Sequence, residues 1–161
     1  MTEQGADQRS LFRRWPAGVS VVVAEADGRR HGLTVSSLLS LSLEPPLVGI
    51  SIARQASLHE LLRSAGEWAA SFLSGDQEEL AKHFARSVPP IALWDGIELR
   101  TDDPRLLVGA SGWLVARTVD THPAGDHVIF VGEPTRVERG EAGSSLVHFD
   151  RHYVAVAGDP R

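Results

Sequence analysis

The chain has 161 residues, which is the size of one compact domain. Hydrophobic residues make up 42% of it and charged residues 23%, a globular composition that disfavours a disordered or fibrous chain. With no cysteine, the chain cannot form disulfides, thiolate metal sites, iron–sulfur clusters or a cysteine nucleophile. The formal net charge is -5, and we find no basic patch that would suit nucleic acid or an anionic membrane surface.

The first ten residues are polar and lack the apolar core of a secretory signal. No later segment approaches the run of about 18 apolar residues that a membrane span needs. We therefore expect a cytoplasmic protein that binds neither membrane nor nucleic acid. Residues 1–10 are expected to form a flexible N-terminal tail, and residues 11–161 a single domain.

Hydrophobic periodicity predicts many short strands and a few short helices. Alternation of apolar and polar residues is typical of strands, whereas apolar residues three and four positions apart indicate helices. Asp27-Gly28 is a hairpin signal, and we place another turn over 122–125. Trp94 is expected to pack inward from an irregular connection. In chain order, the predicted elements are a helix at 11–15, strands at 19–25, 33–43 and 47–53, a helix at 57–65, a strand at 68–73, a helix at 76–85, and strands at 106–119, 128–138 and 152–157.

Two helix starts carry capping signals. Ser57 with Glu60, and Asp76 with Glu79, have the spacing of capping boxes, and Pro89-Pro90 should end the second helix. Many short strands with two inserted helices predict a mainly β (α+β) protein. We expect a small antiparallel barrel with flanking helices over its open ends.

The strand predicted over 33–43 carries the first candidate site. Hydroxyl groups dominate one of its faces, at Thr34, Ser36, Ser40 and Ser42. Hydroxyls and amides at fixed spacing can receive the carbonyl and nitrogen edges of a flat, polar heterocycle. A half-buried strand whose polar side meets water has the same pattern, so this strand alone leaves both interpretations open.

A second candidate is the segment 51–57, where a strand end leads into a helix. Arg54 offers bidentate donors, and the helix start adds free amides and a partial positive charge, which together would hold a phosphate. The alternative is that Ser57 only caps the helix and Arg54 is solvated.

The third candidate is His127, which follows a turn and begins a strand. Its imidazole could donate to a substrate amide or carboxylate, although a lone histidine can equally be a hydrogen-bonded structural residue. Asp126 could be a turn residue, a partner of His127, or both.

Metal and hydrolytic sites are not predicted. His148 and His152 would lie about 13 Å apart on the strand expected over 147–156, too far to share one ion. No glycine-flanked serine elbow follows a parallel strand, so we discount a serine hydrolase as well.

Taken in order, five segments resemble the flavin reductase domain of the FMN-binding split-barrel family. These are the short-chain flavin:NAD(P)H reductases of two-component monooxygenases. The resemblance extends over about residues 11–156 and implies a Greek-key split β-barrel. The segments that carry it are 12–19, 32–37, 43–47, 51–54 and 125–132.

The resemblance also implies ligands, partners and contacts. The cofactor would be FMN or FAD, with NADH or NADPH as hydride donor, and His127 would lie near the nicotinamide as the catalytic residue. A homodimer with the flavin close to the subunit boundary is implied, as is a partner flavin-dependent monooxygenase. The expected flavin contacts are Thr34, Val35, Ser36 and Ser37 at the ring edge, Ser51, Ile52 and Ala53 beside the ring and ribityl chain, and Arg54 and Ser57 at the phosphate.

Two places depart from the family pattern. Ser71 stands where relatives commonly have an asparagine, and we keep it among the cofactor-binding candidates. Residues 150–152, Asp-Arg-His, stand where relatives often have Arg-Gly-Arg before the tyrosine, here Tyr153.

The leading hypothesis is therefore an NAD(P)H-dependent flavin reductase. The alternatives are a non-catalytic flavin- or haem-binding dimer that acts as sensor or carrier, and a docking partner that only hands flavin to an oxygenase. A pyridoxamine phosphate oxidase shares the broad architecture, but less of its basic phosphate-binding set is visible.

Overall fold

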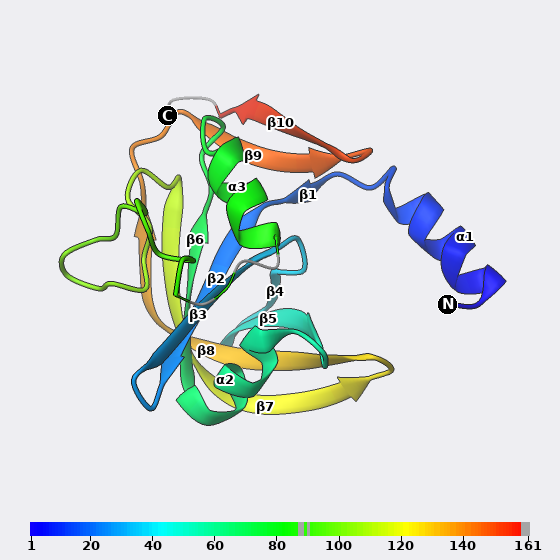
Figure 1. The fold of residues 1–161 in the computed structure, drawn as a ribbon, viewed down its shortest axis with the longest axis horizontal. Helices are drawn as coiled ribbons and strands as arrows, with labels where there is room; N and C mark the ends of the chain where they lie inside the picture. Colours follow the sequence, from blue (N-terminus) through cyan, green and yellow to red (C-terminus); the bar gives the residue numbers. More distant parts are fainter. Residues whose placement is uncertain (87–88, 90, 159–161) are drawn as a thin grey trace.

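The computed structural model describes residues 1–86, 89 and 91–158 (Figure 1). Within these residues, no helix has the length and apolar character needed to span a membrane. The elements in chain order are α1 (Glu3–Phe12), β1 (Ala17–Gly18), β2 (Ser20–Ala26), β3 (Arg29–Val35), β4 (Leu39–Leu43), β5 (Pro46–Ala53), α2 (Ser57–Ala65), β6 (Glu67–Phe72), α3 (Glu78–Ala85), β7 (Gly112–Ala124), β8 (His127–Arg139), β9 (Ser144–Phe149) and β10 (His152–Ala157).

The strands form two antiparallel sheets, which confirms the predicted mainly β fold. The larger sheet has seven strands in the order β3-β2-β6-β7-β8-β5-β4, and the smaller has three in the order β1-β9-β10. The predicted hairpin between β2 and β3 is present, with Asp27 and Gly28 at positive φ of 52° and 71°. Two residues at positive φ are what a two-residue hairpin turn requires.

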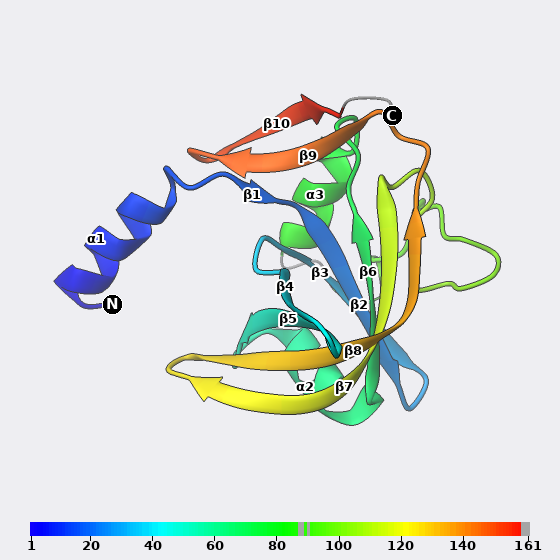
Figure 2. The same cartoon turned by 180° about the vertical axis from the view of Figure 1, so that it is seen from behind.

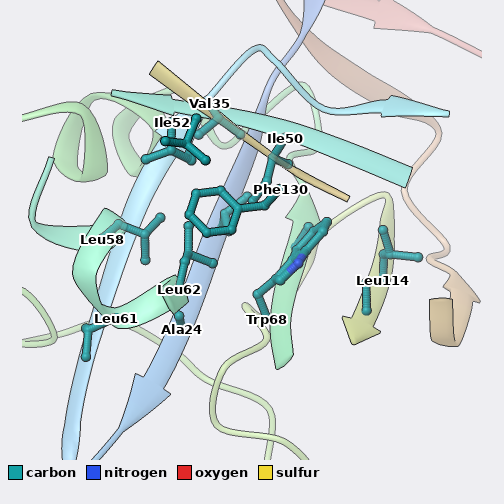
Figure 3. Close-up of a cluster of buried hydrophobic side chains, with 14 residues drawn as sticks. Ala24, Val35, Ile50, Ile52, Leu58, Leu61, Leu62, Trp68, Leu114 and Phe130 are labelled. Atoms are coloured by element: carbon teal, nitrogen blue, oxygen red, sulfur yellow. The ribbon is translucent and has the colours of Figure 1, made fainter. Parts of the chain in front are cut away.

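Strand β2 is buried on both faces because a helix covers each of them. Val22 belongs to one core cluster, with α2, Trp68 and Phe130 (Figure 3). Val21 and Val23 belong to a second cluster, which includes the α3 side chains Ala81 and Phe84. The run of valines is thus typical of a strand between two layers, and the two helices lie on opposite sides of it.

The N-terminal segment differs from the prediction. We expected a flexible tail over 1–10 and a short helix from Leu11, but the structure has one helix, α1, that begins at Glu3. The Thr2 hydroxyl caps it by accepting a hydrogen bond from the Gly5 amide at 3.2 Å. No residue of α1 is buried, and the helix projects from the rest of the molecule (Figures 1 and 2).

Both predicted capping boxes are wrong. Helix α2 begins at Ser57 itself, with Ala56 in the N-cap position and no side chain bonded to the first amides. A turn closed by the hydrogen bond from the Ala56 amide to the Ala53 carbonyl, at 3.0 Å, places the helix start there. Helix α3 likewise has no side-chain cap, because the Asp76 carboxylate accepts from the Ser74 hydroxyl instead.

Three strand boundaries also differ. The strand predicted over 33–43 is divided into β3 and β4 by a bend at Ser36–Leu38. The strand predicted over 106–119 begins only at Gly112 and continues through the turn expected at 122–125, so the hairpin turn is Gly125-Asp126. The end of α3 at Ala85, by contrast, agrees with the helix predicted over 76–85, and of the two prolines expected to end it only Pro89 lies within the described residues.

The segment 147–156 is a hairpin rather than one strand. Asp150 and Arg151 form its turn at positive φ of 45° and 69°. His148 therefore pairs with Tyr153 across the hairpin, and His152 pairs with Phe149.

Gly132 of β8 lies at a tightly packed point of the large sheet. A Cβ atom there would lie 2.8 Å from the Ala116 Cβ and 3.0 Å from the Trp68 ring. We expect Gly132→Ala to lower the free energy of unfolding by about 1–3 kcal/mol, because neither buried neighbour can move freely. Chemical denaturation measures this, with Gly143→Ala as the control, since a Cβ at Gly143 meets nothing within 4 Å. Equal losses in the two variants would contradict the tight packing.

Candidate functional site

The pairing of β5 with β8 brings two of the candidate segments together. Ala53 pairs with His127, and Ser51 pairs with Ile129. The neighbouring pair Ile52 and Val128 faces the core. Because side chains alternate along a strand, Ser51, Ala53 and His127 share the opposite, outer face.

The loop after β3 is fastened to this face by one hydroxyl. The Ser37 hydroxyl donates to the Ser51 carbonyl at 2.9 Å and accepts from the Ser51 amide at 3.1 Å. This double contact accounts for the bend between β3 and β4. The neighbouring residue, Ser36, is exposed.

Arg54 joins the end of β5 to the turn before β8. Its backbone amide donates to the Asp126 carbonyl at 2.9 Å, and its side-chain Nε donates to the Gly125 carbonyl at 3.1 Å. The side chain is exposed, so its terminal nitrogens can still meet a ligand.

The start of α2 lies three residues beyond Arg54. The first amides of a helix lack the usual acceptor four residues earlier, and here no side chain caps them. The His59 amide donates to the Ala56 carbonyl at 2.9 Å, so the amides of Ser57 and Leu58 are the ones open to a ligand. Ser57, the first residue of α2, is exposed. Free amides, a hydroxyl and a guanidinium together have the chemistry of a phosphate site.

His127 is held by its neighbour Asp126. Its Nδ1 lies 2.7 Å from the Asp126 carboxylate, so the predicted partnership is present. The hydrogen bond from His127 lowers the pKa of the Asp126 carboxyl group below its ordinary value. The His127 side chain is 42% exposed, and its Nε2 is the ring nitrogen left for a ligand.

Four candidate residues direct their side chains elsewhere. Val35 and Ile52 are buried in the core, so a ligand could meet only their backbone groups. The Thr34 hydroxyl donates to the Ala81 carbonyl of α3 at 2.7 Å. The Ser71 hydroxyl is fully buried and accepts from the Leu107 amide at 2.9 Å. The structure therefore does not bring Ser71 to the outer face of β5 and β8.

A cavity of about 660 Å³ lies beside the start of α2, with Ser57 in its wall. Arg30, His31 and Trp94 also line it, and the Arg30 guanidinium carbon lies 4.3 Å from the centre of the Trp94 ring. Burial lowers the pKa of the His31 imidazole below its ordinary value. Trp94 packs inward as predicted, against the cluster that contains Phe84. Arg30 and His31 were not predicted as site residues, because Arg30 meets Trp94 only through the packing of a distant loop.

Comparison with known proteins identifies the family of this chain. The family described as flavin reductase like domain matches residues 12–157. The chain belongs to this family.

Two relatives and one solved structure show how far the similarity to this flavin reductase family extends. The reductase component of 4-hydroxyphenylacetate 3-monooxygenase from Thermus thermophilus is 39% identical over 146 residues, which are 90% of this chain and 92% of that protein. An NADH:FMN oxidoreductase of Rhodococcus erythropolis is 35% identical over 156 residues, covering 91% of this chain and 80% of that protein. The structure of an NADH:FAD oxidoreductase of Streptomyces globisporus with NAD and FAD fragments has a TM-score of 0.87 and 29% identity, covering 99% of this chain and 96% of that one.

Arg54 provides the first test of the site. Arg54→Gln removes the charge but keeps a side-chain amide that can donate to the Gly125 carbonyl. We expect FMN binding to weaken by about 10- to 100-fold, because hydrogen bonds to charged groups contribute about 1.5–3 kcal/mol. Calorimetry should show little change for riboflavin, which lacks the phosphate, or for Arg63→Gln at the far end of α2. Equal losses of FMN and riboflavin would argue against a phosphate contact.

Ser71 provides the second test. Ser71→Ala leaves the buried Leu107 amide without its acceptor, so we expect the free energy of unfolding to fall by about 1–3 kcal/mol. FMN affinity, measured by calorimetry on the folded variant, should stay within about twofold of the parent chain. A large loss of affinity with unchanged stability would show that Ser71 contacts flavin.

Proposed function

We propose that this protein is an NAD(P)H-dependent flavin reductase that acts on FMN or FAD and supplies reduced flavin to a partner monooxygenase. The observation that carries the proposal is the junction of β5, α2 and β8. There, Arg54 and the uncapped start of α2 lie next to the turn that carries His127. Two relatives support it, because one is named as the reductase component of a monooxygenase and the other as an NADH:FMN oxidoreductase.

The residues at the junction fit a flavin. We infer that Arg54, Ser57 and the first amides of α2 hold the phosphate, and that Ser36, Ser51 and the backbone around them border the ring. When bound, the flavin supplies the redox chemistry by accepting a hydride from the reduced nicotinamide. The chain therefore needs no nucleophile of its own, and its part is to bind and orient the two reactants.

His127 is proposed to position the nicotinamide. Asp126 fixes the orientation of its ring through Nδ1, which leaves Nε2 directed at a ligand on the outer face of β5 and β8. A ring nitrogen in this place can hydrogen bond to the carboxamide of a nicotinamide. Its proposed role is thus to set geometry rather than to remove a proton.

We also propose that the protein works in the cytoplasm as a homodimer. The absence of cysteine suits a reducing compartment. The dimer would place the flavin near the subunit boundary, as the family resemblance implies.

Anaerobic stopped-flow mixing tests the activity directly. The purified protein, loaded with FMN, is mixed with NADH or with NADPH while the absorbance of oxidised flavin is followed. If the protein is a reductase, the absorbance of oxidised flavin disappears after each addition of FMN. If it is only a carrier, its flavin stays oxidised. Persistent oxidised flavin with both donors would contradict the proposal.

His127→Ala should separate turnover from flavin binding. We expect kcat/KM for the nicotinamide donor to fall roughly tenfold, the equivalent of one hydrogen bond of about 1.4 kcal/mol. The Kd of FMN should change by less than about threefold. His122→Ala is the matched control, because this exposed histidine lies in the same hairpin. If the two variants behave alike, His127 does not contact the nicotinamide.

A further inference from the structure

The N-terminal arm, residues 3–15, exposes an apolar surface that nothing in the described chain covers. Leu11 is 70% exposed, Phe12 is 60% exposed and Trp15 is 69% exposed. Leu11, Phe12 and Trp15 line one shallow hollow where α1 ends, so the three side chains lie together. Exposed apolar groups gathered in this way mark a contact surface.

In this structure the apolar face of the arm does not pack against its own subunit. Contacts on both sides of Pro16 fix the direction of the arm. The Arg13 carbonyl accepts from the Asp150 amide at 2.8 Å, and Ala17 pairs with His148 of β9. Both views show the arm leading away from the two sheets (Figures 1 and 2).

The same chain carries an apolar groove that the arm could fill. The split groove has a volume of about 700 Å³, and residues of β1, β4, β5 and β9 are among those that line it. Most of the side chains that line it are aliphatic or aromatic. Among them are Leu38, Leu39, Leu43, Leu47, Phe72 and Val137.

We propose that the arm of one subunit lies in the split groove of a second copy, and that a two-fold axis repeats the contact. A two-fold interface needs one chain that carries both complementary surfaces, as this one does. Burying the exposed parts of Leu11, Phe12 and Trp15 removes roughly 400 Å² from water per arm. Two arms and two grooves then bury roughly 1,600 Å², the usual size of a stable interface.

This arrangement places the partner beside the proposed flavin site. Leu38 and Leu39 line the groove and directly follow Ser36 and Ser37, the loop fastened to β5. A seated arm would therefore support the strand that leads out of this loop. The inference rests on the homodimer proposed above and names the surfaces that form it.

The absence of cysteine makes a cross-linking test simple. Phe12→Cys and Leu43→Cys are purified separately, mixed without flavin and treated with a short bismaleimide. We expect a covalent dimer in the mixture, and little in a mixture of Phe12→Cys with Val119→Cys, an exposed β7 position outside the groove. In a chain that carries both Phe12→Cys and Leu43→Cys, covalent dimers support arm exchange. Cross-linked monomers would show that each arm binds its own groove and would overturn the proposal.

The mass in solution gives a second readout. Removing residues 1–12 and replacing Trp15 by Asp should convert the dimer to a monomer of 17.4 kDa or less by light scattering, while the circular dichroism of the sheets is kept. A dimer that survives this change and does not cross-link would show that other surfaces form it. The NADH and FMN assay is separate, so either proposal can fail while the other stands.

Discussion

The register of β5 against β8 is the constraint on which the site depends. Side chains alternate between the two faces of a strand, so a slip of one residue would turn Ser51 and Ala53 into the core. Ile50 and Ile52, which are buried on the inner face of β5, would then meet water. Each such side chain stabilises the fold by about 1.5–3 kcal/mol when buried. The core therefore fixes which residues a ligand can meet, although the core residues themselves never touch it.

Hydrogen bonds to the backbone then convert this register into a site. Ser37 uses its hydroxyl as both donor and acceptor against Ser51, and this double contact holds the loop against β5. Arg54 commits only Nε to the Gly125 carbonyl, which leaves the rest of its guanidinium free to act. Since the same turn leads into His127, Arg54 links the proposed phosphate end of the site to the proposed nicotinamide end.

The sequence predicted the strand pattern well, but it predicted less well which face of a sheet each side chain occupies. The strand pattern, the β2–β3 hairpin and the pairing of Asp126 with His127 depend on neighbouring residues, which alternation and turn chemistry describe. Thr34 was a candidate by its hydroxyl pattern as well as by resemblance, and Ser71 by resemblance alone, yet both are in register with Val21 and share its face. Only the pairing of three strands reveals this. The capping boxes failed for a similar reason, because a turn before α2 sets its start.

The division of the strands into two sheets connects assembly with ligand binding. The smaller sheet holds the root of the arm through β9, and β4 of the larger sheet continues directly from the loop that Ser37 fastens to β5. A flavin that orders this loop would also order Leu38 and Leu39, two residues in the wall of the split groove. Such ordering would strengthen binding of the arm to the groove. Because coupling free energies are reciprocal, the seated arm would strengthen flavin binding by the same factor. The open groove thus offers this fold a physical route by which a partner subunit acts on the flavin site without touching the flavin.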